Sequence, residues 1–398
     1  MQSILAFFVI IVALATFAHF GQLPEGEEMP QPQETPSQTT TSVPTKTQTF
    51  LKSPNPTPKP PTPKSPTPKP AELKPTLLID TYIISGPKEG EAIGDTNKVI
   101  FEFRGAVSPK ELENKLTFET KIEGFDENWE KTSSQKREIN LPPGPKEYTF
   151  LVRAKINDSV DSTPARRTFK INTSPYFGKV KISSLQIGYS SHPSLITLST
   201  YLKAEEKIDI TGWQIRGKRG SFNIPKGIEK YHPFYDSELM ENIIVKSGDT
   251  IYLSGAPNPL GRNNNFRPNK CLGYLANYHN FAISFPKNCP KPEGEEISYL
   301  DPCCQKFIHN LRECEAPNYS SNLVILGDSE CTSYLTNNFN YDACFRKYSR
   351  DGDFLENQWH IYMEKDFTVS NDCDTLYLQD KNGLIVDKYS YGWPVCRF

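Results

Sequence analysis

The chain has 398 residues and a formal net charge of −2, with 45 basic and 47 acidic side chains. This balance gives the whole protein no attraction to polyanions, so we expect no nucleic-acid partner. The length allows two or three domains at roughly 150 residues each. All nine cysteines lie between Cys271 and Cys396. Such a cluster in a chain with an export-type segment predicts disulfides formed outside the reducing cytosol.

An apolar segment opens the chain. From Ile4 to Phe20 only Thr16 and His19 interrupt the apolar residues. Its length, about 17 residues, lies between that of a signal-peptide core and that of the shortest membrane-spanning helix. No Lys or Arg precedes it. We predict that residues 1–23 form an uncleaved signal anchor, a transmembrane helix that holds the protein at a membrane. A cleaved signal peptide is the alternative, and both export the chain.

Residues 24–76 are dominated by Pro, Thr, Ser, Gln and Lys, and the sequence Pro-Thr-Pro-Lys recurs between Pro56 and Lys69. This composition lacks the apolar side chains that would offset the entropy of ordering, so we predict a disordered linker. Polyproline II still extends by about 3.1 Å per residue, so the linker would hold the following domains away from the membrane. A recognition site for proline-binding modules is the alternative.

Residues 77–172 carry a β pattern. Several runs are rich in β-branched and aromatic residues, and breaks that contain Gly or Pro separate them. Their spacing suits an Ig-like β-sandwich. The runs are 99–103, 116–122, 148–154 and 167–171.

Features of this stretch resemble the triple-tyrosine domain, a fibronectin-III-like Ig fold found outside the membrane in bacterial sensor proteins. They are Ile122-Glu123-Gly124-Phe125-Asp126 with Trp129, the turn Leu141-Pro142-Pro143-Gly144, and the strand from Tyr148 to Ala154. The resemblance implies an extracellular spacer module. For Trp129 we expect a core or rim position in the sandwich, and a sugar-stacking platform is the alternative.

A second β pattern begins near residue 176 and continues to the C-terminus. The chain closes in a predicted hairpin, in which Asn382-Gly383 supplies the positive-φ turn between 374–379 and 384–389. The earlier runs are 180–189, 195–202, 208–215 and 251–254.

The strand Asp209-Ile210-Thr211-Gly212-Trp213, the region 221–227 and the closing hairpin look like the lamin-tail domain, an Ig-like β-sandwich. We predict such a domain over 176–398, interrupted by a cysteine-rich insert at 262–365. The pattern is similar to membrane-anchored lamin-tail proteins of bacteria, which implies interaction and scaffolding. The predicted fold class is therefore mainly β. It comprises two Ig-like β-sandwiches after an N-terminal helix and a disordered linker, with a small α-helical, disulfide-rich insert in the second sandwich.

The insert is predicted to contain helices. Asp301 followed by Pro302 is typical of a helix N-cap and first turn, and apolar residues then recur at helical spacing from Cys304 to Cys314. A second helical stretch is expected from Cys331 to Tyr348, with a break near Asn340.

These helices constrain the expected disulfides. On one helix, Cys304 and Cys314 would lie about 15 Å apart, which is too far for a bridge. An antiparallel helical hairpin pairs residues whose index sums are nearly constant, and a local loop and the final hairpin suggest the remaining bridges. The predicted pairs are Cys271–Cys289, Cys304–Cys344, Cys314–Cys331 and Cys373–Cys396, with Cys303 left unpaired.

We predict no catalytic, cofactor or metal site. Zinc is the main rival to the disulfides, but Cys303, Cys304, His309 and Cys314 lack the usual ligand spacing. A cysteine nucleophile would require Cys303 beside His309, and an oxidising compartment would inactivate it. The acids Asp351, Asp353 and Glu356 fit a solvated loop better than a calcium site.

One aromatic run in the insert lies close to His279. Core packing explains it better than a ligand-binding face, which is the alternative. The run comprises Tyr274, Tyr278, Phe281 and Phe285.

The sequence therefore predicts a non-enzymatic, membrane-anchored extracellular surface protein. Its lamin-tail-like head would bind protein, glycan or envelope polymer as an adhesion or scaffolding module. The alternative is an exported hydrolase with its site in the insert, which would lose turnover on alanine substitution of His279, His309 or Asp351. Nucleic-acid capture would need a basic face, of which only a hint is present: Lys203, Lys207, Arg216, Lys218 and Arg219.

Overall fold

The computed structural model describes residues 77–189, 192–233, 240–364, 367 and 369–392. The described part consists mainly of β-strands with a few short helices, which confirms the predicted mainly-β fold class. The predicted anchor, 1–23, and the predicted linker, 24–76, lie outside the described residues. Among the described helices, none is long and apolar enough to cross a membrane.

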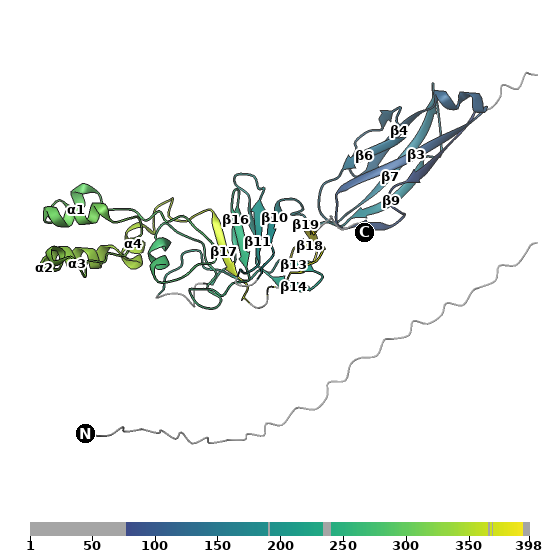
Figure 1. The fold of residues 1–398 in the computed structure, drawn as a ribbon. Helices are drawn as coiled ribbons and strands as arrows, with labels where there is room; N and C mark the ends of the chain where they lie inside the picture. The colour runs from purple at the N-terminus through teal and green to yellow at the C-terminus, as the bar shows by residue number, and fades with distance from the viewer. Residues whose placement is uncertain (1–76, 190–191, 234–239, 365–366, 368, 393–398) are drawn as a thin grey trace, which may run out of the picture. The chain divides into compact units, whose positions relative to one another are not determined.

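The first β region contains two sheets (Figure 1). One has the strand order β1-β3-β6, and the other has the order β2-β9-β7-β4-β5, with β8 paired to β7. A 3-10 helix, η1 (Lys110–Lys115), follows β3. The strands are β1 (Leu78–Ser85), β2 (Glu91–Ile93), β3 (Lys98–Ser108), β4 (Thr117–Glu123), β5 (Glu130–Thr132), β6 (Lys136–Asn140), β7 (Lys146–Ile156), β8 (Ser159–Val160) and β9 (Ala165–Ile171).

Alternation of apolar and polar residues explains how these two sheets pack. Every second residue of β3 is buried, so Phe101 and Phe103 point to the same side of their sheet. Phe101 stacks on Phe150 of the other sheet with ring centroids 4.0 Å apart, and Phe103 meets Phe118 at 5.1 Å. The two inner faces therefore share one core, as in a β-sandwich. At its rim, Trp129 is half-buried beneath the guanidinium of Arg153, 4.2 Å from the ring centroid.

The second β region has two four-stranded sheets and a short ribbon. The sheet orders are β10-β11-β16-β17 and β14-β13-β18-β19, and the ribbon pairs β12 with β15. The strands are β10 (Val180–Gln186), β11 (Leu195–Thr200), β12 (Lys207–Asp209), β13 (Gln214–Gly217), β14 (Gly220–Asn223), β15 (Ile244–Lys246), β16 (Thr250–Ser254), β17 (Gln358–Tyr362), β18 (Asp374–Gln379) and β19 (Ile385–Tyr391).

These strands enclose a second apolar core, in which Trp213 and Trp359 are the largest fully buried side chains. The predicted closing hairpin is present, because β18 and β19 pair antiparallel and Gly383 has a φ of +77°. The run 208–215, expected as one strand, is two. It turns at Gly212, whose φ is +78°, and continues in a different sheet. The turn delivers Trp213 into the core.

Strands β16 and β17 pair in parallel and lie side by side in Figure 1. Ile251 opposes Trp359, and Leu253 opposes Ile361 in the same register. Parallel neighbours cannot be joined by a tight turn, so a long crossover connection is required. The cysteine-rich insert supplies it. The predicted insert, 262–365, therefore extends too far, because β17 already belongs to the sandwich core.

The insert is built from short helices around an apolar core, to which residues outside the insert, such as Ile228 and Tyr231, also belong. Asp301 caps the first α-helix by accepting a hydrogen bond from the N–H of Cys303, as its sequence predicts. The predicted break near Asn340 is also present, because Asn340 caps a separate last helix. The helices are η2 (Leu272–Asn277), η3 (Gly294–Ile297), α1 (Pro302–Asn310), α2 (Leu323–Gly327), α3 (Ser329–Asn338) and α4 (Tyr341–Tyr348).

Three disulfides cross-link the insert, and they differ from the predicted pairs. The predicted bridges Cys271–Cys289, Cys304–Cys344 and Cys314–Cys331 are wrong. Cys373 is disulfide-bonded, but its predicted partner, Cys396, lies outside the described residues. Cys303 is free and exposed, as expected. The observed bridges are Cys271–Cys344, Cys289–Cys314 and Cys304–Cys331.

The reason for the error is where the helices end. α1 stops at Asn310, and Cys314 lies beyond it with a φ of +58°, so the two helices do not form the long hairpin that the pairing assumed. The chain instead returns Cys314 to Cys289, with Cα atoms 5.0 Å apart. The break at Asn340 places Cys344 on a helix of its own, α4, and not on one helix with Cys331. There Cys344 bonds to Cys271, at the start of η2.

Candidate binding site

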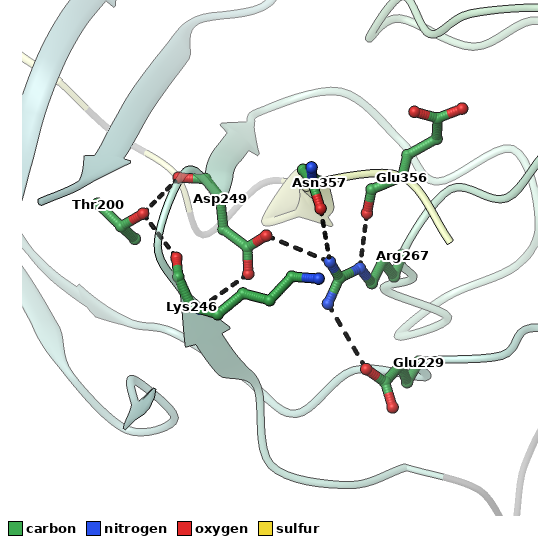
Figure 2. A network of polar contacts seen from close by, with 7 residues as sticks. All are labelled: Thr200, Glu229, Lys246, Asp249, Arg267, Glu356 and Asn357. Atoms are coloured by element: carbon green, nitrogen blue, oxygen red, sulfur yellow. Dashed lines mark hydrogen bonds and ion pairs between the residues drawn. The ribbon is translucent and has the colours of Figure 1, made fainter. Parts of the chain in front are cut away.

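A buried ion pair ties the ends of the insert to the sandwich (Figure 2). Arg267 lies where the chain enters the insert, and Asp249 lies in the turn between β15 and β16. Their side chains meet at 3.2 Å, and the residues are only 3% and 1% exposed. A buried charge is tolerated when it is paired and its other polar atoms are bonded.

Arg267 also holds the segment that leaves the insert. Its Nε donates to the carbonyl of Glu356 at 2.6 Å, and an Nη donates to the Asn357 side chain at 3.4 Å. Its other Nη lies 3.5 Å from the carboxylate of Glu229. The guanidinium of Arg267, at the start of the insert, therefore contacts both the end of the insert and the sandwich, as Figure 2 shows.

The Asp249 side of the pair is equally well bonded. Its carboxylate accepts a hydrogen bond from the N–H of Lys246 at 2.9 Å, and the Thr200 hydroxyl lies 3.0 Å from the Asp249 carbonyl. Burial raises the pKa of the Asp249 carboxyl, against the opposing effects of the Lys246 N–H and the Arg267 charge. No local motif marks Asp249 or Arg267 in the sequence, so sequence reasoning missed both.

An aromatic cluster fixes the first part of the insert on the sandwich. Phe281 packs edge-on against Phe285 at 5.0 Å and against Phe266 at 6.0 Å. The centre of the cluster is His360 on β17, which is fully buried and lies 6.1 Å from the ring of Phe285. The Phe281 and Phe285 rings therefore hold the loop after η2 in place.

Beside this cluster is a surface groove of about 600 Å³, which we call the aromatic groove. Three segments that are distant in sequence form it: the residues before β11, the loop after β16 and the loop after η2. The N–H of Gly255 donates to the carbonyl of Ser194 at 2.9 Å and so joins the first two segments. The groove is lined by His192, Pro193, Gly255, Ala256, Pro257, Pro259, Tyr278, His279, Asn280 and Ala282.

Two of the rings that line the groove, those of Tyr278 and His192, are exposed. Tyr278 is 76% exposed at its edge. On the opposite segment, His192 stacks on Tyr189, which is 71% exposed, with ring centroids 4.9 Å apart. Because these exposed rings border a groove, this surface is the candidate binding site of the second β region.

The predicted aromatic run therefore divides. Tyr274 is buried, and burial raises its pKa to about 12. Phe281 and Phe285 pack in the insert core, as expected, whereas Tyr278 and His279 face the groove. The expectation of core packing is thus wrong for Tyr278, which is exposed.

The acidic loop Asp351–Asp353 holds a cation of the chain itself. The ammonium of Lys270 lies 3.1 Å from the Asp351 carboxylate and 2.7 Å from that of Asp353. Burial acts to lower the pKa of Lys270, but its bonds to the two carboxylates raise it overall. Lys270 thus neutralises two of the carboxylates that a calcium ion would need. The main-chain carbonyl of Glu356, the third acid of the predicted loop, accepts a hydrogen bond from Arg267.

The residues proposed for the alternative, a hydrolase, are not brought together in the described part of the chain. His279 lines the aromatic groove, His309 lies on the exposed side of α1, and Asp351 pairs with Lys270. The proposed zinc ligands are also dispersed, because Cys304 and Cys314 are oxidised with different partners. Within the described residues no cluster of potential metal ligands occurs.

The buried imidazole of His360 predicts a pH-dependent stability. Burial lowers its pKa from 6.5 to about 3. Below about pH 6.5 the unfolded chain binds a proton that the folded chain excludes. The free energy of unfolding should therefore fall as the pH drops from 6.5 towards 3, by roughly 1.4 kcal/mol per pH unit from this residue.

The measurement is urea unfolding across this pH range for the wild type and for His360→Gln. A plot of the free energy of unfolding against pH should be steeper for the wild type than for the variant, by roughly 1.4 kcal/mol per pH unit. This difference corresponds to one proton, because the other titrating groups contribute equally to both proteins. Equal slopes would contradict a buried neutral imidazole.

Comparisons with known proteins bear on the first β region. Residues 109–174 match the Y_Y_Y domain family, in agreement with the predicted triple-tyrosine resemblance. This match spans η1 to the end of β9, the part that supplies most of the larger sheet. No curated protein matches the chain. The lamin-tail resemblance of the second β region stays a prediction.

Solved structures also match part of the chain. The extracellular domain assigned to a hybrid two-component system of B. thetaiotaomicron is 20% identical over 24% of this chain and 14% of its own length, with a TM-score of 0.17. A second B. thetaiotaomicron extracellular domain, assigned to a one-component system, is 16% identical over 24% and 15%, with a TM-score of 0.18. Chicken CNTN1 FN1–FN3 domains are 11% identical over 44% and 57%, with a TM-score of 0.18. The chain thus covers a small part of the two bacterial structures.

Proposed function

We propose that this protein is a non-enzymatic extracellular surface protein that binds a glycan in the aromatic groove of its second β region. In this proposal residues 1–23 anchor it in a membrane, residues 24–76 are the spacer, and the Y_Y_Y-like region is a spacer module. The lamin-tail resemblance supports an interaction role for the head. Disulfides in the insert are typical of proteins that fold outside the cytosol.

The observation that carries the proposal is the exposure of Tyr278 at the edge of a groove of about 600 Å³. Tyrosine has an apolar face and a polar edge, which suits the alternating apolar and hydroxylated surfaces of a sugar ring. Asn280 and the groove imidazoles add hydrogen-bonding groups. The volume is in the range of sites that bind small molecules or single sugar units.

The residue types that line the groove also bear on whether it binds or hydrolyses a glycan. Glycoside hydrolases usually place two carboxylates across the scissile bond. The residues that line the aromatic groove supply rings, prolines, an amide and backbone groups, and none of them is Asp or Glu. This set favours recognition over bond cleavage.

Substitution of Tyr278 tests the proposal. Calorimetry of the full chain, purified in detergent, should detect binding of neutral β-linked oligosaccharides, with cellotetraose and an N-acetylglucosamine tetrasaccharide as probes. Tyr278→Ala should weaken binding about three- to tenfold, since an aromatic stacking contact contributes about 0.5–1.5 kcal/mol. The matched control is Tyr299→Ala, which removes a tyrosine that is 60% exposed in the insert but outside the groove.

Binding that is absent in the wild type, or weakened equally by the control, would contradict the glycan proposal. The same samples distinguish the alternative. Release of shorter sugars by the wild type, with loss of release in His279→Ala, would identify a hydrolase instead.

A further inference from the structure

A second depression in the head, with a volume of about 450 Å³, is lined by ten residues, of which four are cationic and two are acidic. We call it the lysine cleft. It shares Glu229, Lys246 and Arg267 with the polar network of Figure 2, which is built around the Asp249–Arg267 ion pair and which we call the clamp. Its lining residues are Lys207, Glu229, Lys230, Ile244, Lys246, Arg267, Asp351, Gly352, Phe354 and Leu355.

Two of these lysines are held next to each other by the backbone. Lys207 on β12 and Lys246 on β15 are direct partners in the antiparallel register. Directly opposed residues project from the same face with Cβ atoms about 4.5–5.5 Å apart, and like charges in this arrangement destabilise the pair. The ribbon therefore concentrates positive charge at one place.

The acids of the cleft do not neutralise this pair. The carboxylate of Glu229 lies 3.5 Å from the guanidinium of Arg267, and Asp351 is bound to Lys270 at 3.1 Å. Among the described residues, neither Lys207 nor Lys246 has a side-chain ion pair or hydrogen bond. Both residues are exposed, and a site with unpaired ammonium groups is open to an anion.

A third ammonium is fixed at the same cleft. The Nζ of Lys230 donates to the carbonyl of Ser349 at 2.8 Å, a contact that orients the side chain without removing its charge. Arg267, which lines the same cleft and is buried, is held by its bonds to Asp249 and to the carbonyl of Glu356. The cleft thus combines charge with two side chains that are already held in place, which limits the ordering cost of binding.

We propose that the lysine cleft binds a tetrahedral oxyanion, a phosphate or sulfate ester group carried by an anionic envelope polysaccharide. A group with several equivalent oxygens can bond to several ammonium groups together, and lysine is an effective point charge for phosphate. This site adds to the proposed function and does not depend on the aromatic groove, so either can fail without the other.

The test is binding of the full chain to two probes, a poly(glycerol phosphate) and a dextran sulfate, with neutral dextran as the reference. The key variant is Lys207→Gln/Lys246→Gln. The matched control, Lys287→Gln/Lys306→Gln, removes two exposed lysines of the insert that lie outside the cleft and so changes the net charge equally. The ratio of the affinities for the two probes distinguishes phosphate from sulfate.

We expect at least one charged probe to bind, with an affinity that falls as salt rises. The key variant should weaken binding about tenfold or more, since hydrogen bonds to charged groups are among the stronger ones, and the control should change it less than twofold. Because both lysines of the key variant are exposed, it should unfold at a urea concentration no lower than the wild type.

Failure of both charged probes to bind, equal binding of neutral dextran, or equal losses in the two variants would overturn the proposal. The variant Tyr278→Ala distinguishes binding in the lysine cleft from binding in the aromatic groove. It should leave binding of the charged probes unchanged, whether or not it affects neutral oligosaccharides.

Discussion

Replacement of Arg267 by methionine is expected to lower the free energy of unfolding by about 3–5 kcal/mol, because it leaves a buried carboxylate without its cation. Asp249 is 1% exposed, and its contact with Arg267 at 3.2 Å would be lost. The carbonyl of Glu356, which accepts from the same guanidinium, would also lose its donor. The variant should therefore loosen both ends of the insert.

The stability lost in Arg267→Met depends on pH through the carboxyl of Asp249. Burial already raises the pKa of Asp249, whereas the Arg267 charge acts to lower it. Removal of Arg267 should raise this pKa further. A group whose pKa is higher in the folded state contributes stability at low pH and loses that contribution as the pH rises through the folded pKa. The cost of Arg267→Met should thus be larger at pH 7 than at pH 5.

Urea unfolding followed by the fluorescence of the buried Trp213 and Trp359 measures this cost. The double variant Arg267→Met/Asp249→Asn should recover part of the loss, because it no longer buries an unpaired charge. Lys381→Met is the matched control. Lys381 pairs with Asp209 at 3.7 Å on the same sandwich but is 60% exposed, so its loss should cost under about 1 kcal/mol. Equal costs for the buried and exposed pairs would contradict the role of the clamp.

The sequence predicts the strands of this protein better than their partners. Alternation in β3 and the Asn382-Gly383 turn are local signals, and both give the observed elements. The pairing of β16 with β17 is not local, since the register joins Ile251 to Trp359 across the whole insert. No periodicity in either segment specifies that partner, so the sequence alone places the end of the insert several residues beyond the start of β17.

For the candidate site, too, the sequence shows local patterns but not which distant segments meet. The aromatic run near His279 was visible in the sequence, but its spacing does not tell which rings face the core. Only the fold shows that Phe281 packs inward while Tyr278 stays exposed. The direction of each ring depends on how the loop after η2 packs on the sandwich, which the local sequence does not specify. The lysine cleft had a weaker signal. Lys207 belongs to the hint of a basic face in the sequence, yet its partner Lys246 follows only from the β12–β15 register.

Loss of the disulfide Cys271–Cys344 is expected to destabilise the insert by about 4 kcal/mol, since the bridge closes a long loop in the unfolded chain. Its sequence separation is 73, against 25 for Cys289–Cys314. On the chain-entropy estimate, loss of the shorter bridge should cost about 1 kcal/mol less. The variants are Cys271→Ala/Cys344→Ala and Cys289→Ala/Cys314→Ala, with the exposed Cys303→Ala as the control.

Urea unfolding under non-reducing conditions gives the three costs, and the control should change stability by no more than about 0.5 kcal/mol. Peptide mapping without reduction tests the connectivity on the same wild-type sample. It should link the peptide of Cys271 to that of Cys344, with Cα atoms 5.8 Å apart in the structure. A peptide that links Cys271 to Cys289 would restore the local loop that the sequence suggested and would remove the main covalent connection between η2 and α4. The aromatic groove would then lose a support, because its Tyr278 directly follows η2.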